Sequence, residues 1–377
     1  MKKMVMMATV PMSFATLVKG QPRYLSKDFD LSIITSEGPQ NKEIEAFEGV
    51  PIYSINMTRK ITPIEDLKAL WKIYCYLRKI RPDIIYTFTP KAGLLGMMAA
   101  FFARVPIRVH NIVGMPLMEA KGIKKHILKW IEQFTYSLST HLYSNSYGLK
   151  NYVEKNLTKK EIKVVKEGSI NGVDSENFQN TFLDDEKYLL HQRLNIANSD
   201  FVLIFVGRVV KDKGVNELVQ AFATLQIQYP QLKLLILGDF EEELSPVEPK
   251  TIDILKNNRG IRLLGFQKDI RPYLSIANLF VLPSYREGLP NSLIEAGSYG
   301  IPLLATNING CNEVIIPNET GLLVEKKSIK ALIAGISMLL EDKQLYEKIK
   351  RQVRKITISR YDQKDFWEAL DQELLAL

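Results

Sequence analysis

Short runs of apolar and β-branched residues alternate with helical patterns along this chain, and the alternation occurs twice. Before residue 170 the runs are MVMMATV, DLSIITS, PIYSI, DIIYTFT, IRVHNI, HLYSNS and KVVKEG. After residue 200 they are FVLIFVG, LKLLILGD, IRLLGF, LFVLPS, PLLATN and GLLVE. Strands that are joined through helices form parallel sheets with both faces covered. The sequence therefore predicts two doubly wound, Rossmann-like α/β domains.

The length agrees with this division, because 377 residues exceed what one hydrophobic core usually supports. The polar segment 171–188, NGVDSENFQNTFLDDEKY, is the natural seam. In doubly wound sheets, ligands bind beyond the carboxyl ends of the strands. In a chain of two such domains, the cleft between them is the expected active site.

Charge is distributed unevenly along the chain. The net charge is +8, of which residues 1–180 carry +10 and the remaining residues −2. Such an asymmetry predicts that the first domain meets an anionic surface, either nucleic acid or phospholipid headgroups. Basic residues do not interleave with aromatic residues along strands, and no zinc-finger or helix-turn-helix pattern occurs. We therefore favour a membrane over nucleic acid.

Other sequence features exclude several protein classes. Cys75 and Cys311 are far apart, which favours a reducing compartment and disfavours a disulfide framework. No pair of histidines has ligand spacing, and the DFD at 28–30 precedes a strand, so we predict no metal site. MKKMVMMATV is interpreted as a first strand and not as a signal peptide. The longest apolar run, at 92–103, is too short to span a bilayer.

The most informative stretch is SYREGLPNSLIEAG, which places Glu287 on a glycine-proline loop and Glu295 in the helix that follows. Pro290 suits the first turn of that helix, so the N–H groups of Asn291 and Ser292 would be free to meet a phosphate. Glu295 could then accept hydrogen bonds from an adjacent ribose. Either glutamate alone would more often be an exposed surface carboxylate.

A second motif, FVGRVVKDKG, ends a strand and provides Gly207 and Arg208 in the turn and Lys213 before the next helix. An arginine fork and a mobile lysine near a helix N-terminus can bind a diphosphate. Taken alone, such a loop would more often be a surface turn with two solvated cations. No GxGxxG or GxxxxGK[ST] motif occurs, which disfavours a dehydrogenase or an ATPase.

Taken together, these motifs resemble the retaining glycosyltransferases of family 4, which have the GT-B architecture. The similarity is to the branch that builds bacterial capsule, O-antigen and exopolysaccharide. The motifs follow the family's order over nearly the whole chain: ATVPMSFATLVKGQPRYL, GSINGVDSENF, VGRVVKDKG, LGDFEEE, LLGFQKDIRPYLSIANLFVLPSYREGLPNSLIEAGSYGIPLLAT and NGCNEVI.

The resemblance implies a role for each matching residue. Arg208 and Lys213 would hold the diphosphate of a nucleotide-sugar, Glu287 the donor sugar and Glu295 the ribose. Arg208, Lys213 and Glu287 would form the catalytic group. The remaining donor-binding residues would be Gly207, Phe266 beside the base, Gly288, Leu289, Pro290, Asn291 and Ser292. The nucleotide-sugar would be a substrate, and neither a cofactor nor a metal is implied.

In the first half of the chain, the resemblance implies that Gly20 lets a helix start approach the phosphates or the acceptor. Many relatives have a His or Arg in the segment corresponding to NIVGMP, where this chain has Val113. His110 and Glu119 are candidates to contact the acceptor instead. A lone histidine at a strand end is more often structural, and Glu119 would more often be an exposed surface residue.

The predicted enzyme transfers a hexosyl or N-acetylhexosaminyl group from a nucleotide-sugar, most simply a UDP-sugar, to a lipid-diphosphate-linked saccharide. It would act in the cytoplasm, in peripheral contact with the inner face of the plasma membrane. The predicted domains are 1–175 for the acceptor and 176–360 for the nucleotide-sugar, with a C-terminal helix at 361–377 packing back on the first. A sugar-nucleotide 2-epimerase of the same architecture and a catalytically silent sugar-nucleotide-binding protein remain open alternatives.

One further segment, KGIKKHILKWIEQF at 121–134, has apolar residues at helical spacing flanked by lysines. An amphipathic helix usually packs its apolar stripe on a sheet. The positive charge of the first domain equally favours contact with an anionic membrane. The sequence leaves both interpretations open.

Overall fold

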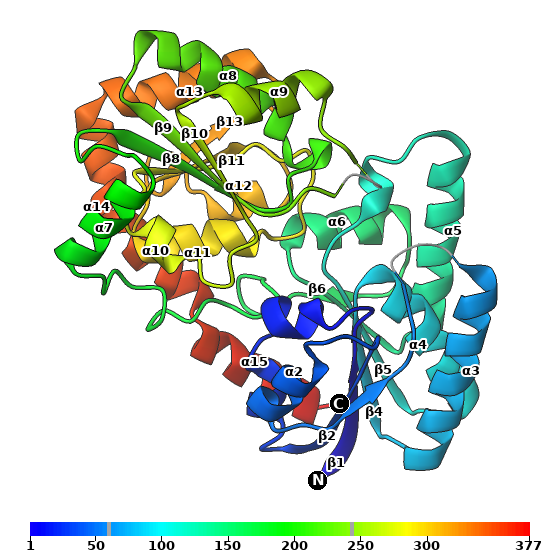
Figure 1. Cartoon of the computed structure of the whole chain (residues 1–377). Helices are drawn as coiled ribbons and strands as arrows, with labels where there is room; N and C mark the ends of the chain where they lie inside the picture. The colour runs from blue at the N-terminus through cyan, green and yellow to red at the C-terminus, as the bar shows by residue number, and fades with distance from the viewer. Residues whose placement is uncertain (59–61, 242–244) are drawn as a thin grey trace. The chain divides into compact units, whose positions relative to one another are not determined.

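The structure, a computed structural model, describes residues 1–58, 62–241 and 245–377, and the chain divides into two compact units. Unit 1 comprises Met1–Gly172 and Gln363–Leu377, and unit 2 comprises Val173–Asp362. Each unit contains one parallel sheet with helices packed on it (Figure 1). The predicted fold class is therefore confirmed. The division falls after Gly172, where the sequence analysis placed it at 175.

Unit 1 has a seven-stranded sheet in the order β3-β2-β1-β4-β5-β6-β7. Its strands are β1 (Lys2–Met7), β2 (Phe29–Thr35), β3 (Ile52–Ser54), β4 (Ile84–Phe88), β5 (Ile107–Ile112), β6 (His141–Ser144) and β7 (Ile162–Lys163). Its helices are η1 (Ser13–Leu17), α1 (Gln21–Leu25), α2 (Asn41–Glu48), α3 (Pro63–Ile80), α4 (Pro90–Ala103), η2 (Pro116–Met118), α5 (Gly122–Leu138), α6 (Tyr147–Asn156) and α15 (Gln363–Leu375).

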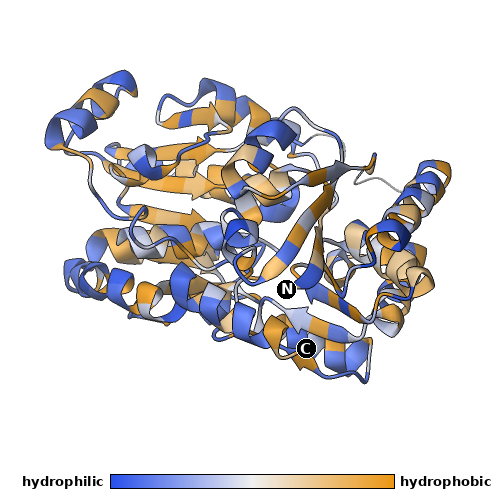
Figure 2. Cartoon of the chain, turned by 90° about the horizontal axis from the view of Figure 1, so that it is seen from below, coloured by the Kyte–Doolittle hydropathy of each residue, from blue (hydrophilic) through white to orange (hydrophobic). Residues whose placement is uncertain are grey.

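The central strands of unit 1 are buried on both faces, because side chains alternate between the two sides of a strand. Met4 and Met6 of β1 belong to one hydrophobic cluster, and Val5 and Met7 belong to another. In Figure 2 the strands of the unit 2 sheet appear mostly orange, and those of unit 1 carry blue as well as orange segments. Burial on both faces explains why the strands read in the sequence as apolar runs without polar alternation.

The last helix, α15, completes the core of unit 1. Phe366, Leu370 and Leu374 are buried in the same cluster as Met4 and Met6. The helix begins at Gln363, two residues later than the predicted segment 361–377. Unit 1 is therefore built from the two ends of the chain.

Unit 2 has a six-stranded sheet in the order β10-β9-β8-β11-β12-β13. Its strands are β8 (Phe201–Val206), β9 (Leu232–Leu237), β10 (Ile261–Gly265), β11 (Leu279–Leu282), β12 (Leu303–Thr306) and β13 (Gly321–Val324). Its helices are α7 (Asp184–Arg193), η3 (Lys211–Lys213), α8 (Val215–Gln228), α9 (Pro249–Asn257), α10 (Arg271–Leu274), α11 (Asn291–Tyr299), α12 (Cys311–Val314), α13 (Ile329–Glu341) and α14 (Lys343–Tyr361).

The strand order of unit 2 reverses between β8 and β11, which are neighbours in the sheet. The chain moves outward through β9 and β10 on one side, and through β12 and β13 on the other. The connections that leave the carboxyl ends of β8 and β11 therefore run to opposite sides of the sheet, and this switch point is where doubly wound sheets bind their ligands. Both motifs singled out in the second half of the sequence follow these two strands.

Among the described residues, no helix combines the length and the apolar character needed to cross a membrane. The longest apolar run of the sequence forms most of α4, which packs against both α3 and α5.

Candidate functional site

The loop after β8 and the loop after β11 pack closely together in unit 2. Gly214 has a positive φ of +72°, and a Cβ built there would lie 2.0 Å from the carbonyl oxygen of Pro283. Only glycine permits this approach, because any other residue would meet backbone that cannot move aside. The close contact fixes Lys213, the residue before Gly214, beside the end of β11.

Lys213 and Glu287 form an ion pair, with Nζ 2.5 Å from Oε1. Their side chains are 20% and 11% exposed, so solvent screens the pair only in part. The two residues lie 74 positions apart in the sequence. The structure thus brings together two of the three residues assigned to the catalytic group.

Arg208, the third residue of that group, forms an ion pair with Glu241. Its guanidinium is 46% exposed and belongs to the turn directly after β8 and Gly207. Glu241 follows β9 in the motif LGDFEEE, but the sequence analysis assigned it no role. Residues 242 and 243, the last two of that motif, lie outside the described residues.

The loop that carries Glu287 packs on the segment that follows β12. The amide of Asn309 donates hydrogen bonds to the carbonyl oxygens of Glu287 (3.1 Å) and Gly288 (3.2 Å). Gly310 has a φ of +79°, and a Cβ there would lie 2.0 Å from the carbonyl oxygen of Gly288. Asn309 and Gly310 therefore position the loop. The sequence analysis quoted their motif, NGCNEVI, without recognising this role.

Cys311 follows this pair as the first residue of α12 and is fully buried. Burial raises the pKa of its thiol well above the ordinary value, with the nearby Glu287 carboxylate adding to the effect. The thiol therefore stays protonated near neutral pH and is a packing group.

Helix α11 starts at Asn291, and Pro290 is its N-cap with extended dihedral angles. The sequence analysis placed Pro290 inside the first turn, so the helix begins one residue later than predicted. The N–H groups of Asn291 and Ser292, in the first turn, have no acceptor within the helix. They provide a partial positive charge suited to an anion.

Glu295 lies on the second turn of α11, and burial raises its pKa to about 7. The free carboxyl is therefore partly protonated at neutral pH.

Leu289, between the two glutamates in sequence, is buried in the core of unit 2 and anchors the loop. Phe266 follows β10 and is exposed, with its N–H donating to Asp239 Oδ1 at 2.9 Å.

In unit 1 the structure gives Gly20 a packing role. Its N–H donates to Glu48 Oε1 at 2.8 Å, and a Cβ at this position would lie 2.7 Å from the Trp367 ring. The close approach that the glycine permits is thus to a side chain of α15. The structure therefore does not favour the ligand approach that was predicted for Gly20.

His110 is buried, and its Nδ1 lies 2.8 Å from Thr87 Oγ1. A Cβ on Gly93 of α4 would lie 2.3 Å from the ring, so the imidazole fills the space between α4 and the sheet. Burial lowers its pKa to about 4. His110 is a neutral core residue, in line with the structural role that the sequence analysis weighed against contact with the acceptor. Val113 and Glu119 are half-buried on the segment after β5.

Among the described residues, no group of three or more His, Cys, Asp or Glu side chains is arranged to hold a metal ion.

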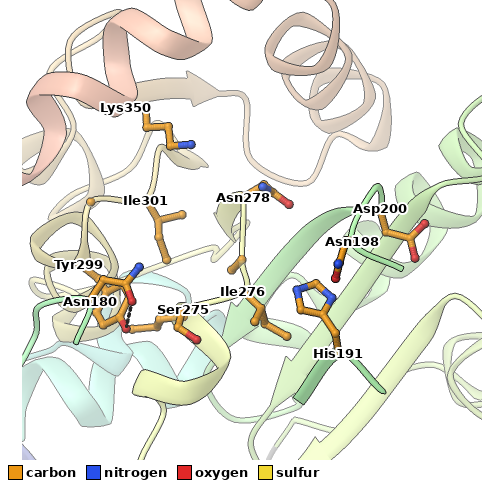
Figure 3. A pocket seen from close by; sticks show the side chains of 13 residues that line it. Asn180, His191, Asn198, Asp200, Ser275, Ile276, Asn278, Tyr299, Ile301 and Lys350 are labelled. Carbon is orange, nitrogen blue, oxygen red and sulfur yellow. Dashed lines mark hydrogen bonds between the residues drawn. The ribbon is translucent and has the colours of Figure 1, made fainter. Parts of the chain in front are cut away.

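A pocket of about 280 Å³ opens at the amino edge of the unit 2 sheet, opposite the carboxyl-end loops. It is lined by Asp200 and Asn278, which precede β8 and β11, and by Tyr299, which donates to Asn180 Oδ1 at 3.4 Å (Figure 3). This pocket is separate from the carboxyl-end loops.

Two parallel sheets, with converging loops at the switch point of the second, define a protein of the GT-B architecture. Solved structures share this fold over the whole chain. HepE of Anabaena, solved in complex with UDP and glucose, superimposes with a TM-score of 0.82 at 20% identity, and each chain is covered completely. Sucrose-phosphate synthase of Thermosynechococcus elongatus gives a TM-score of 0.81 at 19% identity, again with complete coverage.

Sequence comparison then identifies the family. Residues 186–356 match the family described as glycosyl transferases group 1, and residues 10–146 match the one described as glycosyl transferase 4-like. The capsular polysaccharide biosynthesis glycosyltransferase CapM of Staphylococcus aureus is 34% identical, over 94% of this chain and 92% of the relative. The chain therefore belongs to the group 1 glycosyltransferases.

A second relative is the UDP-Gal:alpha-D-GlcNAc-diphosphoundecaprenol alpha-1,3-galactosyltransferase of Escherichia coli. It is 32% identical, over 85% of this chain and 82% of the relative. These relatives give no support to the epimerase alternative.

Proposed function

We propose that this protein is a retaining family 4 glycosyltransferase that moves a hexosyl or N-acetylhexosaminyl group from a UDP-sugar to a lipid-diphosphate-linked saccharide. The reaction would contribute to a bacterial surface polysaccharide. Unit 2 would bind the nucleotide-sugar and unit 1 the acceptor. The observation that carries the proposal is the pairing of Lys213 with Glu287, directly before the N-terminus of α11.

The chemistry follows from the charges at the carboxyl edge of unit 2. Cleavage of the bond between sugar and phosphate leaves negative charge on the departing diphosphate. Lys213, Arg208 and the first-turn N–H groups of α11 are positive groups that are fixed before the reaction begins, so they stabilise that charge without reorganisation. Glu287 holds the lysine in place and can accept hydrogen bonds from hydroxyl groups of the donor sugar.

Because two side-chain cations already supply this charge, we propose that turnover needs no metal ion. Turnover should then be unchanged when a chelator such as EDTA is added in excess. Turnover that disappears with EDTA and returns with Mg²⁺ or Mn²⁺ would contradict this part of the proposal.

The names of the relatives support the proposed substrates. The Escherichia coli relative uses UDP-galactose and a diphosphoundecaprenol-linked acceptor. A third relative, from Campylobacter jejuni, is 28% identical and is named as an N-acetylgalactosaminyltransferase acting on a diphospho-undecaprenol-linked sugar. The Staphylococcus aureus relative is named for capsular polysaccharide synthesis.

The test is a transfer assay with purified protein. UDP-galactose, UDP-N-acetylgalactosamine, UDP-glucose and UDP-N-acetylglucosamine are each incubated with synthetic polyprenyl-diphosphate-linked N-acetylglucosamine. Mass spectrometry of the lipid product and UDP release are measured, and NMR gives the new linkage. We expect one donor to react and to give an α-linkage. Donor binding without transfer to this or to a bacterial lipid-linked saccharide extract would instead indicate a silent binding protein, and a β-linkage would exclude retention.

Donor affinity should rise with pH because of Glu295. Its pKa of about 7 in the free protein lies above the ordinary 4.5, and only the ionised carboxylate accepts two ribose hydroxyls. Binding therefore releases a proton, and affinity for UDP-galactose should increase about 30-fold from about pH 5.5 to about pH 8. The diphosphate of a UDP-sugar does not titrate in this range. Calorimetry of the native protein and of Glu295→Gln checks this, because the variant should bind weakly and independently of pH.

The same raised pKa of Glu295 predicts how the stability of the free protein changes with pH. The protonated carboxyl is favoured in the folded state, so the contribution of Glu295 to the free energy of unfolding is fully present below about pH 4.5. It is lost as pH rises through about 7. At about pH 8, Glu295→Gln should therefore raise the melting temperature of the free protein. A lower melting temperature there would show that the carboxylate is stabilised by a contact that the structure lacks.

A further inference from the structure

The outer surface of unit 1 has an unusual distribution of apolar side chains. Helix α5 exposes Ile123, Ile127 and Trp130, whereas Glu132 and Tyr136 of the same helix are buried. Ile123 is 79% exposed and Trp130 is 65% exposed. An amphipathic helix that only covers a sheet places its apolar residues inward. These apolar side chains of α5 therefore face away from the sheet, which disfavours the interpretation that the stripe packs on it.

Helix α3 repeats this arrangement, which the sequence analysis did not detect. Its residues Ile64, Leu67 and Trp71 are 65–73% exposed and recur at the spacing of one helix face. Both helices pack against α4 on the same side of the sheet (Figure 1). Their outward faces therefore point in the same direction. We call these six residues the α3–α5 surface: Ile64, Leu67, Trp71, Ile123, Ile127 and Trp130.

The α3–α5 surface lies at one edge of the sheet. A helix that connects two parallel strands runs antiparallel to them, so its first turns lie at the carboxyl edge. All six residues belong to the first three turns of their helices. Carboxyl-edge loops are where sheets of this class bind their ligands.

The charges beside the α5 half of the α3–α5 surface are positive. Lys121, Lys124, Lys125 and Lys129 are exposed on or beside α5, and the only acidic residue of that helix, Glu132, is buried. On α3, Lys68 and Lys72 are exposed, but Lys68 pairs with Glu65 at 2.8 Å and Asp66 lies on the same turns, so the positive charge of the surface comes from α5. Tryptophans that sit at the level of lipid headgroups, together with lysines that meet anionic lipids, are the features by which helices lie on a bilayer.

We propose that unit 1 docks on an anionic phospholipid bilayer through the α3–α5 surface, with Trp71 and Trp130 inserted at the headgroup level. This goes beyond the proposed sugar transfer, because docking needs neither a donor nor an acceptor. It would hold the carboxyl edge of unit 1 close to the plane in which a lipid-linked saccharide is presented. The experiments below also test whether this surface binds a second copy of the chain instead of a bilayer.

The first experiment is vesicle flotation with the full-length chain. We expect binding to vesicles of equal parts phosphatidylglycerol and phosphatidylcholine, and little binding to phosphatidylcholine alone. Trp71→Ser with Trp130→Ser should weaken binding on the order of a hundredfold, and Lys124→Gln with Lys125→Gln about 30-fold. Matched controls are Leu189→Ser with Ile227→Ser and Lys343→Gln with Lys348→Gln, which alter exposed residues of unit 2 and should bind as the native chain does.

The second experiment uses the three tryptophans as reporters. With phosphatidylglycerol vesicles, the emission of the native chain should shift to the blue and be quenched by brominated phosphatidylglycerol. In Trp71→Phe with Trp130→Phe, only Trp367 remains, packed against Tyr24, and the shift should vanish while circular dichroism stays native. Equal binding of all variants, absence of binding to anionic vesicles, or self-association through this surface in place of vesicle binding would overturn the proposal. Neither readout involves turnover, so a failure of these experiments would not count against the proposed transfer reaction, which is tested separately.

Discussion

Replacing Lys213 or Arg208 by alanine is expected to lower kcat by about 10²–10³ while the chain stays folded, because in the proposed site each removal takes away one positive charge that would face the departing diphosphate. Lys213 is held by Glu287 at 2.5 Å and by the close packing of Gly214, so its charge cannot be replaced by rearrangement of a neighbour. Arg208→Lys should recover part of the loss, because a point charge remains while the planar fork is lost. Initial rates of UDP release with saturating donor and acceptor measure the effect.

The matched control for this experiment is Lys211→Ala. Lys211 lies on the same 3-10 turn as Lys213, but it is 52% exposed and pairs loosely with Glu248 at 3.9 Å. Its removal changes the net charge equally, so turnover should stay near the native value. Because Lys213→Ala leaves the Glu287 carboxylate without its partner, the melting temperature of Lys213→Ala, measured beside its turnover, separates lost stability from lost catalysis. Native-like turnover in both single variants would remove Arg208 and Lys213 from the site.

Gly310→Ala is expected to lower donor affinity by about tenfold or more. A methyl group at Gly310 would lie 2.0 Å from the carbonyl oxygen of Gly288, so the loop that carries Glu287 must shift. A displacement of about 1 Å at a positioning element can cost as much as 10²-fold in rate. The loss should appear in calorimetry with UDP-galactose and again in kcat/KM.

Gly300→Ala isolates the steric part of this effect. Gly300 also has a positive φ, +92°, and lies at the other end of α11, where the nearest atom to an added Cβ is 3.9 Å away. Gly300, with ψ +19°, is in the left-handed region, so its alanine variant incurs a backbone cost of roughly 1–2 kcal/mol. Gly310, with ψ −48°, lies outside that region, so its alanine variant incurs at least as much. Only Gly310→Ala should lose affinity beyond what its lower stability explains. Equal affinities in the two folded variants would show that the packing of Gly310 does not position the loop.

The sequence was most informative where local pattern and tertiary structure agree. Central strands such as β1 and β8 are buried on both faces, so each appears as a continuous apolar run that no surface strand would show. The edge strands β3 and β7 are only three and two residues long, and the runs PIYSI and KVVKEG overstated them. Pairing at an edge depends on one neighbour, which a local pattern does not record.

Contacts between loops that are distant in the chain could not be predicted from the sequence. Glu241 beside Arg208, Asn309 beneath the Glu287 loop and Trp367 against Gly20 each join segments that are far apart in the chain. The motifs LGDFEEE and NGCNEVI contained two of these residues but gave no sign of what they would touch. The role of His110 stayed open for the same reason, because only the packing of Gly93 shows that the ring faces the core.

By itself, the sequence determined the two doubly wound sheets, a seam within 171–188 and the motifs that follow β8 and β11. These features follow from hydrophobic periodicity and from glycine and proline signals, which act over a few residues. Only the tertiary structure decided which side chains pair, which glycines are required by close packing and which face of α5 meets solvent. Such properties depend on what lies opposite a residue in space, and chain order does not specify that partner.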